Sequence, residues 1–190
     1  SPLGIRLIED ASHAVGAQDN GEPTGSCKWS DIAIFSFHPV KILTTAEGGM
    51  ALTNDDELAA KMDRLRSHGI TRDPNLMKNE PHGGWYYEQI ELGWNYRMTE
   101  IQAALGLSQM DRLDQFLEKR HAILDRYTTL LADLPVVLPK QRDGVYSALH
   151  LYPVLFADSN TRKKVYDGLR EKDIFTQVHY IPVHLQPYYQ

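Results

Sequence analysis

The sequence has one cysteine, Cys27, and no apolar run longer than a few residues. A single cysteine excludes an internal disulfide and a cysteine-based zinc cluster, and it fits the reducing conditions of the cytosol. Such short apolar runs cannot cross a bilayer, which takes about 20 apolar residues. We therefore expect a cytoplasmic protein with no membrane partner, and we interpret Cys27 as a structural thiol.

The sequence also lacks an excess of basic residues. It carries 20 Lys and Arg against 25 Asp and Glu in 190 residues, and the two signs are interspersed. Proteins that bind nucleic acid usually present a basic stripe or patch, so we expect no nucleic-acid partner. A phosphorylated small molecule stays possible, because a few backbone N–H groups and one or two basic side chains can hold a phosphate.

Several common site motifs are missing: no G-x-G-x-x-G, P-loop or G-x-S-x-G pattern occurs. His179 and His184 are five residues apart, so on a strand they would point to opposite faces, and neither has a Cys pair or a carboxylate at ligand spacing. We predict no metal site. There is no initiator Met or signal peptide, and we interpret both ends as cuts through a longer protein.

The apolar pattern predicts an α/β protein in two parts. We expect strands at 5–9, 32–37 and 50–53, a helix capped by Asn54 and ended by Gly69, and a long irregular loop at 70–95. Thr99 begins a helix that reaches about residue 134, with a weak point at Gly106; a strand (147–156), a helix (160–171) and a strand (175–180) follow. We predict a large domain at 1–108, with a mostly parallel sheet and helices, and a smaller α+β domain at 109–190.

Three polar residues stand where the first two strands end. Asp10 follows the first strand, and ligands of open α/β sheets bind at the carboxyl ends of strands. Ser36 ends the second strand, where its hydroxyl can donate to a phosphate. Pro39 forces an extended backbone on the residue before it and carries Lys41 around a corner, where a partly buried amine is a better nucleophile. Taken singly, Asp10 is also a good helix cap and Lys41 an ordinary surface lysine.

Two further segments are compatible with a ligand. The hydroxyls and glycines of Thr44-Thr45-Ala46-Glu47-Gly48-Gly49 allow close backbone approach, although a tight hairpin explains them equally well. Asn95 stands just before the expected helix N-terminus, a place that attracts phosphate, but it is also a fair cap candidate.

These pieces are much more specific in combination. The order Glu9-Asp10-Ala11-Ser12-His13-Ala14, Ser36-Phe37-His38-Pro39-Val40-Lys41, Glu47-Gly48-Gly49 and Gly93-Trp94-Asn95-Tyr96-Arg97-Met98 resembles the DegT/StrS family of nucleotide-sugar aminotransferases. These are pyridoxal-phosphate (PLP) enzymes of fold-type I. The resemblance covers nearly the whole chain.

The resemblance implies a role for each matching residue. Lys41 corresponds to the lysine that holds PLP in a Schiff base, and Asp10 to the acid that pairs with the pyridine nitrogen and keeps PLP an effective electron sink. The remaining implied contacts are His13 beside the cofactor ring (often Gln in the family), Ser36 on the cofactor phosphate, Asn95 on the phosphate in the partner subunit's site, and His38 and His179 on the substrate side.

A narrower resemblance concerns the segments 95–120, 150–153 and 179–189, which are similar to PseC-type transaminases. It implies transfer of an amino group from glutamate to the C4 ketone of a UDP-linked 4-keto-6-deoxy-N-acetylhexosamine, on a pseudaminic acid-type pathway. It also implies a homodimer with shared active sites. The family's N-terminal half, with a phosphate loop and an aromatic that stacks on PLP, has no counterpart in this sequence, so we expect the isolated 190 residues to be inactive.

Two other functions are compatible with the sequence. PLP-dependent sugar dehydratases share the scaffold but carry His in place of the lysine, so Lys41 favours transamination. A non-catalytic relative that binds a ligand or regulates a partner would be expected to have lost Asp10, Ser36 or Lys41, and all three are present.

Overall fold

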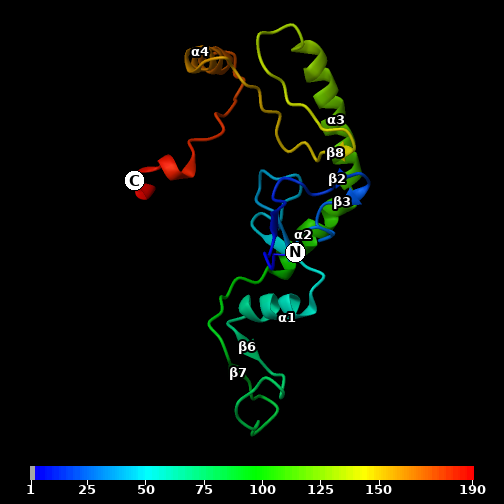
Figure 1. Cartoon of the computed structure of the whole chain (residues 1–190), viewed down its shortest axis with the longest axis vertical. Helices are drawn as coiled ribbons and strands as arrows, with labels where there is room; N and C mark the ends of the chain where they lie inside the picture. Colours follow the sequence, from blue (N-terminus) through cyan, green and yellow to red (C-terminus); the bar gives the residue numbers. More distant parts are fainter. Residues whose placement is uncertain (1–2) are drawn as a thin grey trace. The chain divides into compact units, whose positions relative to one another are not determined.

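The computed structural model describes residues 3–190 (Figure 1). Its internal contacts form two compact units: unit 1 contains Ser1–Arg120 and Arg142–His150, and unit 2 contains His121–Gln141 and Leu151–Gln190. The domain boundary at 108/109 stays a prediction.

The largest sheet of unit 1 has the strand order β1-β4-β5, with β1 at Ile8–Asp10, β4 at Ile32–Ser36 and β5 at Gly49–Leu52. Strands β1 and β4 run parallel, and Asp10 is level with Ile34; β4 and β5 are antiparallel, and Ser36 is level with Gly49. The three strands expected in this part of the sequence are therefore confirmed, with the first one starting three residues later than expected.

The two faces of this sheet differ in burial. Because side chains alternate along a strand, Ala33 and Phe35 share one face, and they are buried. Residues Ile8, Asp10, Ile34 and Ser36 share the other face, where Ile8 is 64% exposed and Ile34 40% exposed. The sheet thus carries one packed face and one open apolar face that also holds Asp10 and Ser36.

The buried face contacts a core made by the segments that follow the strands. One cluster joins Ala11, Val15, Phe35, Phe37 and Leu43, with Leu113 and Phe116 packed against it. A second cluster joins Ala17, Ile42, Leu117 and Ala148. The backbone directly after Lys41 is therefore fixed by two consecutive buried side chains, Ile42 and Leu43.

Helix α1 spans Asp56–Leu65, and its N-cap is Asp55, whose carboxylate accepts from the N–H groups of Glu57 and Leu58. The prediction of Asn54 as the N-cap is wrong by one residue. The side chain of Asn54 instead donates to the carbonyl of Ser26 at 2.8 Å. Gly69 lies beyond the helix end with a φ of +70°, and a Cβ there would meet the carbonyl oxygen of Glu91. Glycine is needed at that position because the returning chain passes so close.

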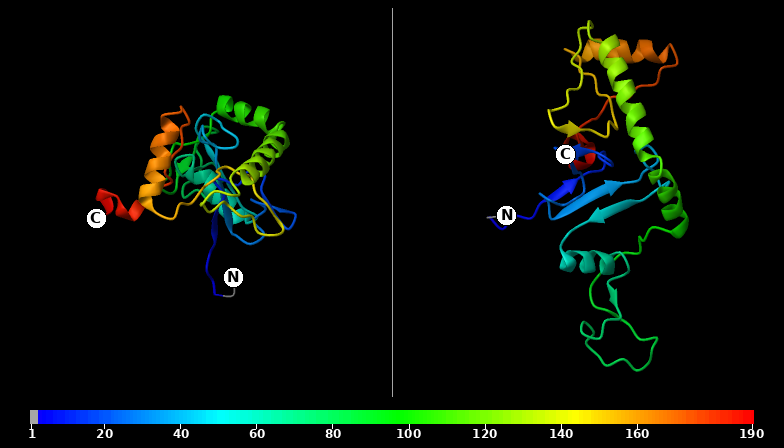
Figure 2. Two further views of the ribbon diagram at one scale, coloured as in Figure 1. Left: turned by 90° about the horizontal axis from the view of Figure 1, so that it is seen from above. Right: turned by 90° about the vertical axis from the view of Figure 1, so that its right-hand side faces the viewer.

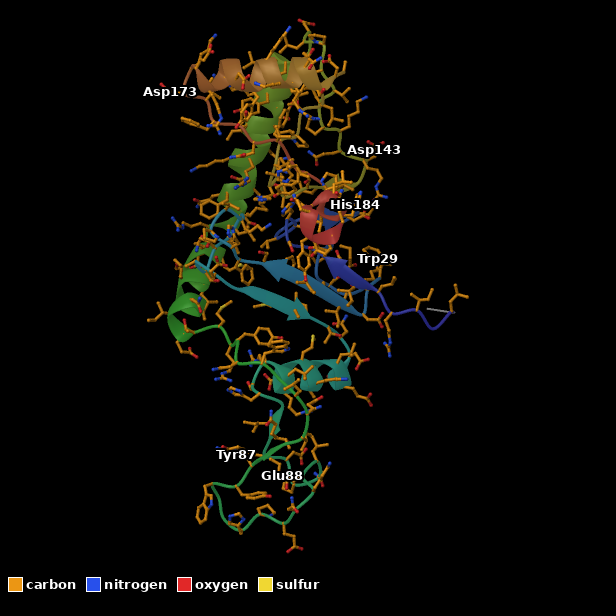
Figure 3. All side chains as sticks on the ribbon, turned by 90° about the vertical axis from the view of Figure 1, so that its left-hand side faces the viewer. Trp29, Tyr87, Glu88, Asp143, Asp173 and His184 are labelled. Atoms are coloured by element: carbon orange, nitrogen blue, oxygen red, sulfur yellow. The ribbon has the colours of Figure 1, made fainter. Side chains whose placement is uncertain are left out.

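The expected long loop is irregular apart from a short hairpin at its base, β6 at Ile70–Thr71 and β7 at Glu88–Gln89. We call residues 70–89 the arm. Figures 1 and 2 show it extending beyond α1, away from the β1-β4-β5 sheet. Tyr87 and Glu88 lie next to each other on it (Figure 3).

The expected long helix is divided in two. Helix α2 spans Glu100–Met110 and begins with a capping box between Thr99 and Gln102, as the sequence predicts. It ends at the C-cap Asp111, and α3 spans Leu113–Leu130. The break therefore falls several residues after Gly106, which lies inside α2.

A second sheet of unit 1 was not predicted. Strands β2 (Gln18–Asp19) and β3 (Glu22–Pro23) form a hairpin, and β8 (Val145–Tyr146) pairs with β2. Asn20 and Gly21 connect β2 to β3 with φ angles of 50° and 80°, the left-handed conformations that a tight two-residue hairpin turn requires.

Unit 2 contains the end of α3, helix α4 at Ser159–Arg170, and two short 3₁₀ helices, Val183–Leu185 and Pro187–Tyr189. The predicted helix at 160–171 is confirmed. The strands predicted at 147–156 and 175–180 are wrong: the described part of unit 2 has only an isolated bridge, between Val137 and Leu155. No helix within residues 3–190 has both the length and the apolar character needed to cross a membrane.

Candidate active site

Asp10 ends β1 and begins a tight turn. Its Oδ1 accepts two hydrogen bonds from Ser12, one from the hydroxyl at 2.6 Å and one from the backbone N–H at 3.1 Å. The ladder with β4 continues one step further, because the N–H of Ala11 donates to the carbonyl of Ile34 at 2.9 Å. The carboxylate is thus held on a short, rigid segment at the carboxyl end of the strand.

The electrostatics of Asp10 favour its ionised form. The hydroxyl of Ser12, then its backbone N–H, and then the charges of His13 and Lys41 lower the pKa of Asp10 below its ordinary value, against an opposing effect of partial burial. An ionised carboxylate is the form that can pair with a protonated ring nitrogen.

Lys41 ends a turn that His38 begins. The N–H of Lys41 donates to the carbonyl of His38 at 2.9 Å, and the N–H of Val40 donates to Nδ1 of His38 at 3.3 Å. The lysine is half-buried, and its charge acts on Asp10. The corner expected at Pro39 is therefore present, and the lysine after it belongs to the same edge of the sheet as Asp10.

Ser36 and His38 complete this edge. The Oγ of Ser36 accepts weakly from the N–H of His38 at 3.5 Å, so the Ser36 hydroxyl can still donate its hydrogen to another group. His38 is exposed, and its Nε2 lies 4.0 Å from Oε1 of Glu47. Ser36 is the last residue of β4 and His38 follows two residues later, so both lie at the carboxyl end of this strand.

His13 follows the Asp10 turn and is exposed. Its ring lies 4.3 Å from the ring of His150, centroid to centroid, with the planes tilted by 53°. The structure thus gives His13 an aromatic neighbour, and its charge acts on Asp10. Contact with a cofactor ring stays a prediction.

Gly48 and Gly49, which follow Lys41, allow the chain to pack closely against neighbouring residues. A Cβ on Gly48 would collide with Oγ1 of Thr45, and one on Gly49 would come 2.8 Å from the carbonyl oxygen of Phe35. Thr45 is buried, and its hydroxyl donates to the carbonyl of Glu47 at 2.7 Å. Of the two explanations left open for this segment, the structure supports a tight turn against β4.

The other two candidate residues lie elsewhere. Asn95 is exposed and forms an isolated antiparallel bridge with Ser67 at the base of the arm. His179 belongs to unit 2, is exposed, and stacks on Tyr180 with 3.6 Å between ring centroids. Their roles stay predictions.

Sequence reasoning gave no role to Ser12 and Gln109, and gave Gln102 only the role of capping its own helix. Ser12 fixes Asp10, and the Asp-x-Ser spacing was a usable signal, because Asp and Ser readily form such local turns. Gln102 donates to the carbonyl of Glu47 at 3.0 Å, and Gln109 bonds to the backbone of Thr44. These partners are 55 and 65 residues away in sequence, so no local pattern could reveal them.

These side chains fit the chemical groups of PLP. The cofactor needs an anionic partner for its ring nitrogen, an amine for its aldehyde carbon and hydroxyl or N–H donors for its phosphate. Asp10, Lys41 and Ser36 supply one group of each kind at one edge of one sheet. No group of three or more His, Cys, Asp or Glu side chains among residues 3–190 is placed to hold a metal ion.

The sequence profile of the DegT/DnrJ/EryC1/StrS aminotransferase family matches residues 2–190. This chain belongs to that family. It is 40% identical over 189 residues to a UDP-4-amino-4,6-dideoxy-N-acetyl-beta-L-altrosamine transaminase of Campylobacter jejuni, covering 98% of this chain and 47% of the relative. It is also 40% identical over 189 residues to the GDP-perosamine synthase of Caulobacter vibrioides, covering 97% of this chain and 47% of that protein.

A solved structure shows the same fold. The PLP form of the putative sugar aminotransferase Spr1654 from Streptococcus pneumoniae superposes with a TM-score of 0.85 at 33% identity, covering 97% of this chain and 46% of that one. The expected family and the expected α/β fold of PLP-dependent sugar aminotransferases are thereby confirmed. The chain spans about half the length of the relatives it matches.

Proposed function

We propose that the complete protein, meaning this chain together with the further segment that its relatives possess, is a PLP-dependent aminotransferase acting on a nucleotide-linked keto-sugar. The observation that carries the proposal is the placement of Asp10, Ser36 and Lys41 at the carboxyl edge of the β1-β4-β5 sheet, with Asp10 favoured in its ionised form. The family membership and the PLP form of a relative with the same fold support it.

The residues of this chain would divide the work as follows. The carboxylate of Asp10 would hold a proton on the ring nitrogen, since the hydrogen bonds from Ser12 keep that carboxylate ionised. The hydroxyl of Ser36 would donate to the phosphate. The Nζ of Lys41 would bind the cofactor covalently and then, once released, take a proton from one carbon and return it to another. Bound PLP supplies the electron sink that makes the carbon acid enough to lose that proton.

For the substrates, we propose glutamate as the amino donor and the C4 ketone of a UDP-linked 4-keto-6-deoxy-N-acetylhexosamine as the acceptor. The support is the resemblance of segments 95–120, 150–153 and 179–189 to PseC-type enzymes and the activity that the name of the Campylobacter relative states. The Caulobacter relative has the same identity but a GDP-sugar product in its name. Side-by-side assays of a UDP-linked and a GDP-linked 4-keto sugar therefore test this part, and a preference for the GDP sugar contradicts it.

Trapping of the cofactor tests the class of reaction. Borohydride reduction of the complete protein with PLP should attach a pyridoxyl group to Lys41, because only the lysine that forms the bond can be trapped. Peptide mapping reads the position, and the Lys41→Ala variant is the control that should lose the label. A label found on Lys28 or Lys61 in place of Lys41 would overturn the assignment.

For the assembly, we propose a homodimer in which Asn95 reaches the phosphate of the partner's site. The support is indirect: Asn95 is exposed at the base of an arm that extends away from the sheet, and closed two-fold dimers are the commonest soluble oligomers. His13, His38 and His179 are proposed contacts of the cofactor ring and the substrate.

A further inference from the structure

The backbone around Lys41 is held on both sides. On the N-terminal side, the turn from His38 to Lys41 is closed by a hydrogen bond of 2.9 Å. On the C-terminal side, Ile42 and Leu43 are buried, and Thr44 follows them. Thr44 is the residue of this segment whose backbone N–H and carbonyl both bond to a side chain of α2.

Gln109 on α2 contacts Thr44 through both ends of its side-chain amide. Its Oε1 accepts from the N–H of Thr44 at 3.3 Å, and its Nε2 donates to the carbonyl oxygen of the same residue. The second hydrogen of Nε2 points to the carbonyl of Leu105, one turn earlier in the helix, at 3.2 Å. Both polar atoms of the amide are therefore used, and its orientation is fixed, since a flipped amide would place its NH2 group against one N–H donor and its oxygen against two carbonyl acceptors.

The face of α2 that meets this turn is shaped for close approach. Gln102, Gly106 and Gln109 lie four and three residues apart, so they share one side of the helix. A Cβ on Gly106 would come 2.9 Å from Cγ2 of Thr45, which makes a small residue necessary there. Gln102 donates to the carbonyl of Glu47 at 3.0 Å. The helix thus binds the turn at Thr44 and at Glu47, with Gly106 between these two points.

We propose that Gln109 is a positioning residue that sets the place of Lys41 by clamping the backbone of Thr44. The proposal rests on the proposed function, because it concerns the reach of the Lys41 amine toward PLP. Gln109 does not touch the reacting atoms. It acts through two bonds to the backbone of Thr44, next to the buried side chains of Ile42 and Leu43. The segment is also held by the hydroxyl of Thr44, which donates to the carbonyl of Phe37 at 3.1 Å.

The expected effect follows from geometry. A misplacement of about 1 Å between reacting groups can lower a rate by about 100-fold. Loss of the clamp frees one end of a segment that stays anchored at its other contacts, so we expect a smaller effect, about 10-fold, on the rate at which Lys41 bonds to PLP.

Two substitutions and one control test the proposal in the complete protein. Gln109→Met keeps the length of the side chain and removes both hydrogen bonds. Gln109→Glu keeps the acceptor for the Thr44 N–H but loses the donor to its carbonyl while the carboxyl is ionised. Ser108→Ala is the matched control, since Ser108 is exposed on the same helix and its hydroxyl bonds only locally, to the carbonyl of Leu105 at 2.8 Å.

The measurement is the rate of pyridoxyl labelling at Lys41 under cyanoborohydride, read by peptide mapping and divided by the rate of the unsubstituted protein at the same pH. We expect a ratio of about 0.1 for Gln109→Met and near 1 for Ser108→Ala. For Gln109→Glu, the ratio should be low at neutral pH and rise as the pH falls toward about 4.3, because a protonated carboxyl donates as the amide does. A merely structural role would not produce this recovery.

The outcomes separate the two proposals. Equal labelling rates at Lys41 in all variants overturn the role of Gln109 and leave the proposed function intact. Failure of the unsubstituted protein to label at Lys41 contradicts the proposed function; amide hydrogen exchange at 41–44 in the same variants then decides on the clamp, and unchanged exchange in Gln109→Met overturns it. If Gln109→Met does not fold, the pH recovery of Gln109→Glu still decides.

Discussion

Ser12 donates both its hydroxyl and its backbone N–H to a single oxygen of Asp10, at 2.6 and 3.1 Å. Two donors on one carboxylate oxygen stabilise the ionised form, and the pKa of Asp10 is lowered as a result. The acid that the family resemblance assigns to the cofactor ring is therefore prepared by its neighbour two residues later in the chain.

The first prediction concerns Ser12. Ser12→Ala removes the hydroxyl that contributes most to the lowered pKa, so the pKa of Asp10 should rise toward its ordinary value of about 3.9 while the backbone bond remains. Titration of the ¹³C-labelled aspartate carboxyls in the complete apoprotein measures the change. Ser30→Ala is the matched control, because the Ser30 hydroxyl bonds to the adjacent acid Glu9. If the pKa of Asp10 is the same in Ser12→Ala as in the unsubstituted protein, the Ser12 hydroxyl does not lower it.

The second prediction concerns Asp10 itself. Asp10→Asn should leave PLP bound but lower turnover by orders of magnitude, since a neutral amide cannot keep the ring nitrogen protonated. Cofactor absorbance measures binding, and kcat measures the loss. Glu9→Gln serves as the control, because Glu9 lies on the same strand and points to the opposite face. Near-normal turnover of Asp10→Asn would show that this acid does not serve the cofactor.

The third prediction concerns the arm. The carboxylate of Glu88 accepts from the backbone N–H groups of Lys78 and Asn79, from the Asn79 side chain and from the hydroxyl of Tyr86, at 2.6 to 2.9 Å. These bonds, the Lys78 N–H first, lower the pKa of Glu88 to about 2. Because the pKa of Glu88 is lower in the folded protein, its ionised carboxylate stabilises the folded conformation of the arm. This stabilisation is fully present above about pH 4.5 and is lost as the pH falls toward about 2.

Substitution should reproduce that loss at neutral pH. Glu88→Gln leaves one acceptor oxygen in place of two, so amide hydrogen exchange at Lys78 and Asn79 should accelerate several-fold. Glu80→Gln is the control, since Glu80 is an exposed acid of the same arm. Equal exchange in the two variants would mean that Glu88 does not organise the arm.

The fourth prediction concerns assembly. Lys41→Ala and Asn95→Trp should each inactivate a homodimer with shared sites, yet their heterodimer should regain activity, because both lesions then fall in one site and the other is intact. One intact site of two predicts about half the activity of the unsubstituted dimer. A heterodimer of Lys41→Ala with Asp10→Asn is the control and should stay inactive. Absence of recovery in verified Lys41/Asn95 heterodimers would contradict the role of Asn95 in the partner subunit's site.

Much of unit 1 could be predicted because its signals are local. Strand β4 is an apolar run ended by a proline corner, and α2 begins with a capping box, so both were placed nearly correctly. The β2–β3 hairpin was missed although Asn20-Gly21 is a strong turn signal, because its strands are only two residues long. The cap of α1 was misplaced by one residue because Asn54 and Asp55 are both good caps.

The remainder depended on contacts between distant residues. The segments 147–156 and 175–180 are rich in strand-forming residues, but a strand needs a partner, and only the bridge of Leu155 to Val137 forms there. The candidate site shows the same difference between features set by local sequence and features set by distant contacts. The positions of Asp10, Ser36 and Lys41 could be inferred from strand ends, whereas the bonds that Gln109 makes to Thr44 join residues 65 positions apart.

The strand order β1-β4-β5 has a consequence for handling the protein. Within residues 3–190, β4 is paired on both sides, while β1 and β5 each present one unpaired edge, next to the exposed Ile8 and Ile34. Open strand edges with apolar neighbours recruit strands from other molecules, which leads to aggregation. Recombinant material containing only these 190 residues should therefore precipitate readily.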